Sequence, residues 1–119
     1  MVDKGVRMKT VKKASQILKC LADSTRLRIV NLLTKEELNV NALCHIMDKK
    51  QSIVSKHLAQ LRLLDIVGVR KEGLNAYYYL QPSKHSNYND LLKAITVGFT
   101  NLELIRKDTG QLKKINSNK

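Results

Sequence analysis

The chain has 119 residues, a length that suits one domain with a modest core, and hydrophobic residues make up 43% of it. Lysine and arginine total 22 against 10 acidic residues, so the formal net charge is +12 and polyanions are natural partners. No run of about 18 apolar residues predicts a transmembrane helix. No apolar signal region follows the N-terminus either, so we expect a cytoplasmic protein with no membrane partner.

The positive charge is concentrated in three blocks. Residues 1–19 and 49–71 each hold six basic residues and one acidic residue, and residues 106–119 hold five basic and one acidic. The segments between them are close to neutral. Such blocks favour a nucleic-acid partner, because a polyanion binds local concentrations of cations.

Apolar spacing predicts the first two helices. Between Val6 and Leu21, one helical stripe is formed by Val11, Ala14, Ile17, Leu18 and Leu21, and Cys20 falls away from this stripe. The Asp-Ser-Thr segment at 23–25 offers caps for a second helix. The apolar residues of that helix cover two faces, which is typical of a nearly central helix; they are Leu27, Ile29, Val30, Leu32 and Leu33.

Two short helices and a change of period follow. Val40, Leu43, Cys44 and Met47 fall at i, i+3, i+4 and i+7, which predicts a third helix. A polar turn at 48–50 leads to a fourth helix that extends to about Leu64, so the pair predicts a helix-turn-helix. Residues 67–80 are then β-type around a Glu-Gly-Leu-Asn loop at 72–75, which indicates a hairpin. The predicted fold is a winged helix, mainly α with a small β-hairpin.

A final long helix is expected from about Asn87, its cap, to Lys107, with Gly110 as its terminator. Its main apolar stripe consists of Tyr88, Leu91, Leu92, Ile95, Phe99, Leu102 and Ile105. Val97 and Leu104 lie on the other side, which favours a homodimer, although they could also be scattered surface residues. Residues 108–119 are expected to be a flexible basic tail, so one winged-helix domain spans residues 1–119 with its core at about 10–107.

The fourth helix has two different faces at about 100° per residue. Val54, Leu58 and Leu61 form a core face; the opposite face and its flank carry Ser52, Ser55, Lys56, Ala59 and Gln60. Residues 51–61 contain no acidic residue, whereas a merely solvated face more often carries oppositely charged pairs. Short polar side chains around one lysine allow close approach to base edges. This face therefore predicts a helix that reads DNA.

Three further side chains have two interpretations each. His57 lies at the edge of the core face, where a structural histidine bonded to backbone is favoured over a base contact or a ligand. Arg70 and Lys71 precede the hairpin loop and point to opposite faces. Either could contact a phosphate beside the groove, which positions a protein without specifying sequence. Protection of an edge strand by charge explains them equally well.

Four segments carry a resemblance to a known family: LKCLADSTRLRIVNLL (18–33), ELNVNALCHIM (37–47), QSIVSKHLAQLRLLDIV (51–67) and RKEGLNAYYYL (70–80). Together they resemble the ArsR/SmtB family of bacterial repressors over roughly residues 10–105. The resemblance implies a winged helix that dimerises through its first and last helices and binds a pseudo-palindromic operator, often releasing it when an effector binds. It also implies that the groove-facing residues are Gln51, Ser52, Ser55 and Lys56.

The family's sensor sites are not matched. Metal-sensing members resemble Glu-Leu-Cys-Val-Cys-x-Leu-Cys in the third helix, but here Asn39 and Asn41 replace two of the three cysteines. Ser24 also stands where the family often has proline. The Asp-x-His pair of other members is missing around His85, and a dithiol pair is excluded by Asn31 and by the lack of cysteine after Cys44. We therefore expect no metal and no cofactor.

Three hypotheses of function remain. The first is a dimeric, sequence-specific regulator of transcription, acting as a repressor, which contacts double-stranded DNA through Gln51, Ser52, Ser55, Lys56, Gln60, Arg70 and Lys71. The second is a thiol- or metal-responsive repressor that uses Cys20 and Cys44, which are otherwise expected to be reduced thiols. The third is a non-specific architectural DNA-binding protein. An enzyme is not expected, because the sequence contains no phosphate loop, zinc-protease motif or CxxC motif.

Overall fold

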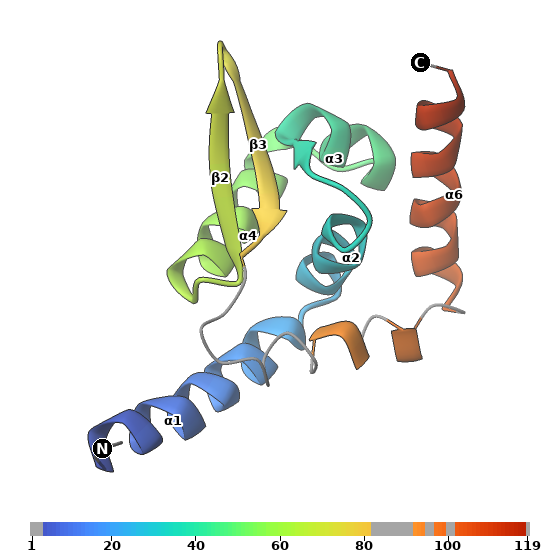
Figure 1. Ribbon diagram of the computed structural model, residues 1–119. Coiled ribbons are helices and arrows are strands. Elements are labelled where there is room, and N and C mark those ends of the chain that lie inside the picture. The colour runs from blue at the N-terminus through green and yellow to red at the C-terminus, as the bar shows by residue number, and fades with distance from the viewer. Residues whose placement is uncertain (1–3, 82–91, 95–96, 100–101, 119) are drawn as a thin grey trace.

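A computed structural model describes residues 4–81, 92–94, 97–99 and 102–118 of the chain. The elements are α1 (Lys4–Leu21), α2 (Ser24–Leu33), β1 (Leu38–Asn39), α3 (Val40–Met47), α4 (Gln51–Leu63), β2 (Val67–Glu72), β3 (Asn75–Leu80) and α6 (Glu103–Ser117). Helices surround α2, the hairpin projects beyond them, and α6 lies on the other side of α2 and α3 (Figure 1). None of the described helices is both long and apolar enough to cross a bilayer.

The second helix is the centre of the core, as its two apolar faces predict. Ile29, Val30 and Leu32 are completely buried. The helix begins at the predicted cap, because the side chain of Asp23 accepts a hydrogen bond of 3.0 Å from the backbone N–H of Arg26. Around it, α1, α3, α4, α6 and the sheet supply most of the remaining buried apolar side chains, and Ile66 and Leu92 add to them from outside these elements.

The apolar stripe predicted for α1 is only partly correct. Ile17 and Leu21 are buried, but Val11 and Leu18 are exposed, and Cys20 is buried instead. The N-terminal part of α1, which holds Val11, extends away from the rest of the domain (Figure 1). In the packed C-terminal part, the buried side is centred on Ile17, Cys20 and Leu21, and Leu18 lies about 100° away from Ile17. A stripe predicted from periodicity alone does not tell which of its members will find a neighbour in the same chain.

The predicted helix-turn-helix is confirmed as α3 and α4. The side chain of Asn39 caps α3 by accepting a 2.8 Å hydrogen bond from the N–H of Ala42. The turn starts at Asp48, whose φ of 53° is left-handed, and the N–H of Lys49 then bonds the carbonyl of Cys44 at 3.1 Å. This closed turn sets the angle at which α4 leaves α3.

The hairpin is confirmed, and the sheet has one strand more than the sequence predicted. β2 and β3 pair antiparallel around a turn in which Gly73 has a φ of 61°. β1 pairs with the other edge of β3, so the strand order is β1-β3-β2. Gly68 lies opposite Tyr79, and a Cβ added at Gly68 would lie 2.6 Å from the Tyr79 ring, so glycine is required for that ring to lie across the strand.

The prediction for the end of the last helix and for the tail was wrong. Helix α6 runs from Glu103 to Ser117, so it passes through Gly110 instead of ending before it. Asn87, Tyr88, Leu91 and Ile95 lie outside the described residues, while residues 92–94 and 97–98 are helical. Glycine inside a helix costs about 1 kcal/mol relative to alanine. Burial of Ile105, Asp108 and Leu112 offsets that cost, and residues 108–117 are therefore part of the folded domain rather than a flexible tail.

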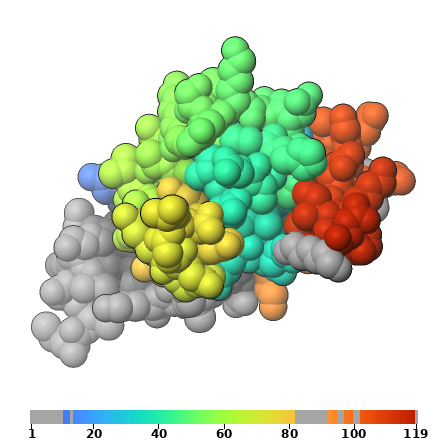
Figure 2. Space-filling view, turned by 90° about the horizontal axis from the view of Figure 1, so that it is seen from above, coloured from blue at the N-terminus to red at the C-terminus, as the bar shows by residue number. Residues whose placement is uncertain are grey.

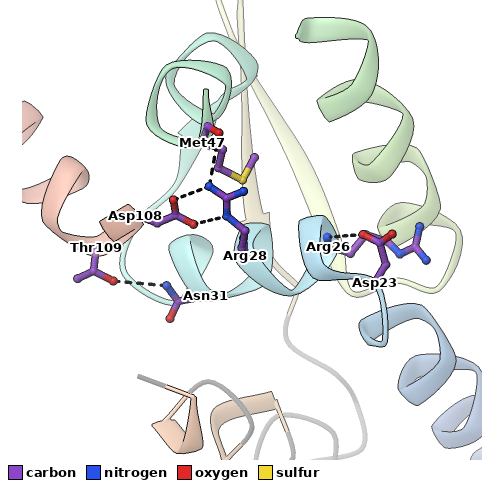
Figure 3. Close-up of polar contacts among 7 residues, drawn as sticks. All are labelled: Asp23, Arg26, Arg28, Asn31, Met47, Asp108 and Thr109. Atoms are coloured by element: carbon purple, nitrogen blue, oxygen red, sulfur yellow. Dashed lines mark hydrogen bonds and ion pairs between the residues drawn. The ribbon is translucent and has the colours of Figure 1, made fainter. Parts of the chain in front are cut away.

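An ion pair buried in the domain holds α6 in place. Asp108 is fully buried and accepts two hydrogen bonds of 2.8 Å from the Arg28 guanidinium of α2 (Figure 3). The same guanidinium donates to the carbonyl of Met47 at 3.4 Å, and one turn along, Asn31 donates to Thr109 at 3.4 Å. The hydrogen bonds to Asp108 raise the pKa of Arg28. Arg28 thus joins α6, α2 and the last residue of α3.

Candidate nucleic-acid interface

The predicted division of α4 into two faces is confirmed. Val54, Leu58 and Leu61 are at most 1% exposed and pack on the core. All the residues predicted for the reading face are exposed to solvent; they are Gln51, Ser52, Ser55, Lys56 and Gln60, together with Ala59. Core packing on one side therefore holds a row of short polar side chains outward on the other, around a single long cation.

Two side chains of α2 and its cap fix the position of α4 through His57. Arg26 donates from Nη1 to His57 Nδ1 at 3.1 Å and from Nε to the carbonyl of Cys20 at 2.8 Å. Asp23 Oδ1 lies 3.8 Å from the same nitrogen of His57. Because arginine can only donate, Nδ1 accepts and the ring proton belongs on Nε2. Burial lowers the pKa of His57 and favours this neutral form. The predicted structural role is supported, but the partner is a side chain rather than backbone.

The turn before α4 adds two cations that were predicted only as turn residues. Lys50 is exposed at the N-cap of α4, and Lys49 is partly exposed. Both belong to the basic block at 49–71, which was the available signal. The N-terminal end of a helix attracts anions through its free N–H groups and its dipole. The N-terminal end of α4 therefore has positive charge from Lys49 and Lys50 before it, from Lys56 in its second turn and from its own backbone.

Arg70 and Lys71 of the hairpin have different surroundings, a difference that the sequence alone does not show. Arg70 donates to Glu37 at 2.9 Å and to Glu72 at 2.6 Å, and its guanidinium lies 5.0 Å from the centre of the Tyr77 ring. These hydrogen bonds raise the pKa of Arg70. The side chain of Lys71 is exposed and makes no hydrogen bond or ion pair with any described residue. Arg70 ties the hairpin to the segment before β1, and Lys71 presents an unpaired charge.

The two cysteines are free and lie in different surroundings. Cys20 is buried in α1, and Cys44 is half-buried on α3, where it packs beside the core. Burial raises the pKa of both thiols, so both favour the protonated, less reactive form. Among the described residues, no group of three or more His, Cys, Asp or Glu side chains is arranged to hold a metal ion.

Solved structures with the same arrangement define the class of protein. Reduced HlyU from Vibrio cholerae superposes with a TM-score of 0.66 at 32% identity, covering 82% of this chain and 95% of that one. The transcriptional repressor BigR from Xylella fastidiosa gives a TM-score of 0.70 at 26% identity, covering 85% and 97%. The helix-turn-helix, the hairpin and the exposed basic face of α4, together with these matches, define a winged-helix DNA-binding regulator of transcription.

The sequence comparisons give the family. A model described as bacterial regulatory protein, arsR family, matches residues 23–69, which include α2, α3 and α4. The arsenic resistance transcriptional regulator ArsR1 of Pseudomonas putida is 37% identical over 92 residues, which are 76% of this chain and 72% of that protein. The chain belongs to the ArsR family of bacterial regulatory proteins.

Proposed function

We propose that the chain is a homodimeric repressor that inserts α4 into the major groove of a pseudo-palindromic operator and responds to no metal. The observation that carries the proposal is the outward face of α4, where short polar side chains surround Lys56 and acidic residues are absent. A major groove about 12 Å wide admits one helix, and short side chains allow its backbone to approach the base edges. The arsenical resistance operon repressor of Escherichia coli, 46% identical over 68 residues, supports repression.

Each residue of the interface has a role that its chemistry suggests. Lys56 can donate to guanine O6 and N7 or to a phosphate, and Gln51 and Gln60 can donate to and accept from one base. Ser52 and Ser55 can bond either a base edge or a phosphate. The base contacts of these side chains add sequence specificity to the non-specific attraction between the phosphates and the cations near the N-terminal end of α4.

The hairpin positions the protein on the DNA and does not read the base sequence. Lys71 contacts a phosphate beside the groove, because its charge is not paired within the described part of the chain. Arg70 acts one step away, by holding the hairpin against Glu37 and Tyr77. Of Arg70 and Lys71, which were both candidates for phosphate contact, we infer that only Lys71 adds directly to the salt dependence of binding.

Exposed apolar side chains on the first helix and in the C-terminal third support a homodimer. Val11 and Leu18 of α1 are 73% and 52% exposed. Among the described residues of the C-terminal third, four more large apolar side chains are exposed, which are Val97, Phe99, Leu102 and Leu104. Scattered single apolar residues are ordinary on a protein surface, but sets on two elements favour an interface. A two-fold dimer would present two copies of α4, which is the symmetry of a pseudo-palindromic operator.

A pair of variants tests the reading face. After binding-site selection gives an operator, Ser55→Ala with Lys56→Ala should leave the fold intact and weaken operator binding, by about 1–3 kcal/mol for each base that is no longer bonded. The matched control, Lys35→Ala with Ser24→Ala, removes the same two residue types from exposed positions at the start of α2 and just after its end, away from the exposed apolar residues of α1. Equal affinity of both double variants would refute the assignment of α4.

The same binding assay separates the other two hypotheses. An architectural protein would bind the selected operator no better than a random duplex at moderate salt. A thiol-responsive repressor would lose operator binding on oxidation, and changing Cys20 and Cys44 to serine would abolish that response. We expect preference for the operator, because of the reading face of α4, and no response to oxidation, because burial raises the pKa of both thiols and favours their protonated form.

A further inference from the structure

The outward side of α6 carries a second set of cations. Ile105, Asp108 and Leu112 form its buried stripe. Four exposed basic residues point away from that stripe, and they are Arg106, Lys107, Lys113 and Lys114. The only exposed acid of α6 is Glu103, one turn before Lys107, and no acidic residue lies three or four positions from Lys113 or Lys114. Glu103 has the spacing to pair with Arg106 or Lys107, whereas the part of the face around Lys113 and Lys114 is positively charged without the pairing that a solvated helix face usually has.

The position of Gly110 is a second, independent feature of this face. Gly110 lies between the basic residues, at the middle of the outward side, and a Cβ added there would meet nothing within 4 Å. Packing inside the chain therefore does not require glycine, although glycine costs the helix about 1 kcal/mol. A residue without a side chain does allow another molecule to approach the helix backbone closely.

The third feature is that α6 is fixed relative to the helix-turn-helix. The Arg28 guanidinium joins Asp108 of α6 to the carbonyl of Met47, immediately before the turn into α4. Near the other end of α6, Asn116 donates to Glu36 at 2.8 Å. Seen from above in Figure 2, the hairpin lies on one side of α3 and α4, and α6 lies on the other. In Figure 1 the hairpin tip and the C-terminal end of α6 point to the same end of the molecule.

We propose that the outward face of α6 is a second phosphate-binding surface, which contacts the duplex beside the segment read by α4. The occupant is double-stranded DNA, because the face is cationic, lacks a side chain at its centre and is rigidly continuous with the helix-turn-helix. This inference rests on the proposed function and adds to it a contact outside the helix-turn-helix and the wing. Such a contact adds affinity and lengthens the footprint, but it does not read sequence.

The test compares the wild type with a double variant that combines Lys113→Gln and Lys114→Gln. The affinity for the selected operator is measured from about 50 to 200 mM salt. A homodimer loses two lysines from each protomer, so four phosphate contacts are lost and the slope of log K against log salt should be smaller by about 3.6. The decrease in affinity over this range should then be smaller than for the wild type by a factor on the order of 100. The control, Lys12→Gln with Lys19→Gln, removes two exposed lysines from α1 and should leave the slope unchanged. Preference for the operator over random duplex should be equal in all three proteins.

Duplex length gives a second measurement. Trimming the DNA on either side of the operator should weaken the wild type and leave the Lys113 and Lys114 double variant unaffected. A further variant, Gly110→Glu, improves helix propensity but places a carboxylate in the middle of the face, so it should weaken binding to the long duplex with the fold retained. Unchanged slopes and equal effects of trimming would overturn the inference. Failure of the wild type to prefer any operator would instead overturn the proposed function.

Discussion

The ion pair between Arg28 and Asp108 gives a prediction about folding that can be measured without knowing the operator. Changing Asp108 to alanine leaves a guanidinium, whose side chain is 11% exposed, without its carboxylate. Removing one partner of a buried pair typically costs about 3–5 kcal/mol, because the remaining charge stays desolvated. Since whole domains are stable by only about 5–15 kcal/mol, the variant should lose a large part of its free energy of unfolding.

The expected values follow from the size of the chain. At about 4 °C per kcal/mol for a domain of this length, Asp108→Ala should lower the Tm by about 12–20 °C. The replacement of both partners, Arg28→Met with Asp108→Leu, should instead fall within about 1 kcal/mol of the wild type, because no unpaired charge remains. Lys107→Ala, at the exposed neighbouring position, should change stability by less than about 0.5 kcal/mol.

The assay is urea unfolding at pH 7 and one fixed protein concentration, since a dimer's stability depends on concentration. Hydrogen exchange adds the local information, because the amides of α6 should lose protection first in the Asp108→Ala variant. A destabilisation below about 1 kcal/mol for Asp108→Ala, or a double variant as unstable as the single one, would refute the reasoning.

Three further predictions concern the wing and the base of α4. Gly68→Ala should lower the free energy of unfolding by about 1–3 kcal/mol, because its Cβ would lie 2.6 Å from the Tyr79 ring. Urea unfolding should show a smaller decrease when Tyr79 is also changed to alanine. Equal decreases would rule out the contact. Because the pKa of His57 is lowered in the folded chain, the unfolded chain binds more protons below about pH 6.5. The free energy of unfolding should therefore decrease as the pH falls from about 6.5 to the folded pKa and then level off. The variant His57→Gln should remove this dependence. Parallel stability curves for the two proteins would contradict that cause. Lys71→Ala removes one lysine from each protomer of the homodimer, so it should reduce the salt slope of operator binding by about 1.8. Arg70→Ala should leave the slope nearly unchanged, and the opposite order would reverse their assignment.

The sequence predicted the central elements because their signals are local and repeated. In α4 the apolar residues recur with the helical period, and the opposite positions carry only short or basic polar residues. The cap at Asp23 and the hairpin turn at Gly73 depend on residue types with strong local preferences. These features need no knowledge of what the segment packs against.

What the sequence did not predict depends on partners far away along the chain. Asp108 was assigned to a tail because it lies in a basic segment, but its partner Arg28 is 80 positions away. A signal was present, since Asp108 shares a helical stripe with Ile105 and Leu112, and Gly110 was wrongly given more weight than this stripe. The contact of His57 with Arg26 and the pairing of β1 with β3 are also long-range, and β1 has only two residues, too few for a period.

The short strand β1 has a consequence for the spacing of the operator. It ends where α3 begins, and its residues Leu38 and Asn39 pair with Tyr78 and Tyr77 of the hairpin. The hairpin is therefore joined to the helix-turn-helix at two places, to α3 by this pairing and to α4 by the direct link into β2. One inserted base pair moves the following phosphates by about 3.4 Å along the axis, and a unit joined in this way cannot stretch to follow them. Under the proposed function, the distance between the bases at α4 and the phosphate at Lys71 is therefore fixed by the fold.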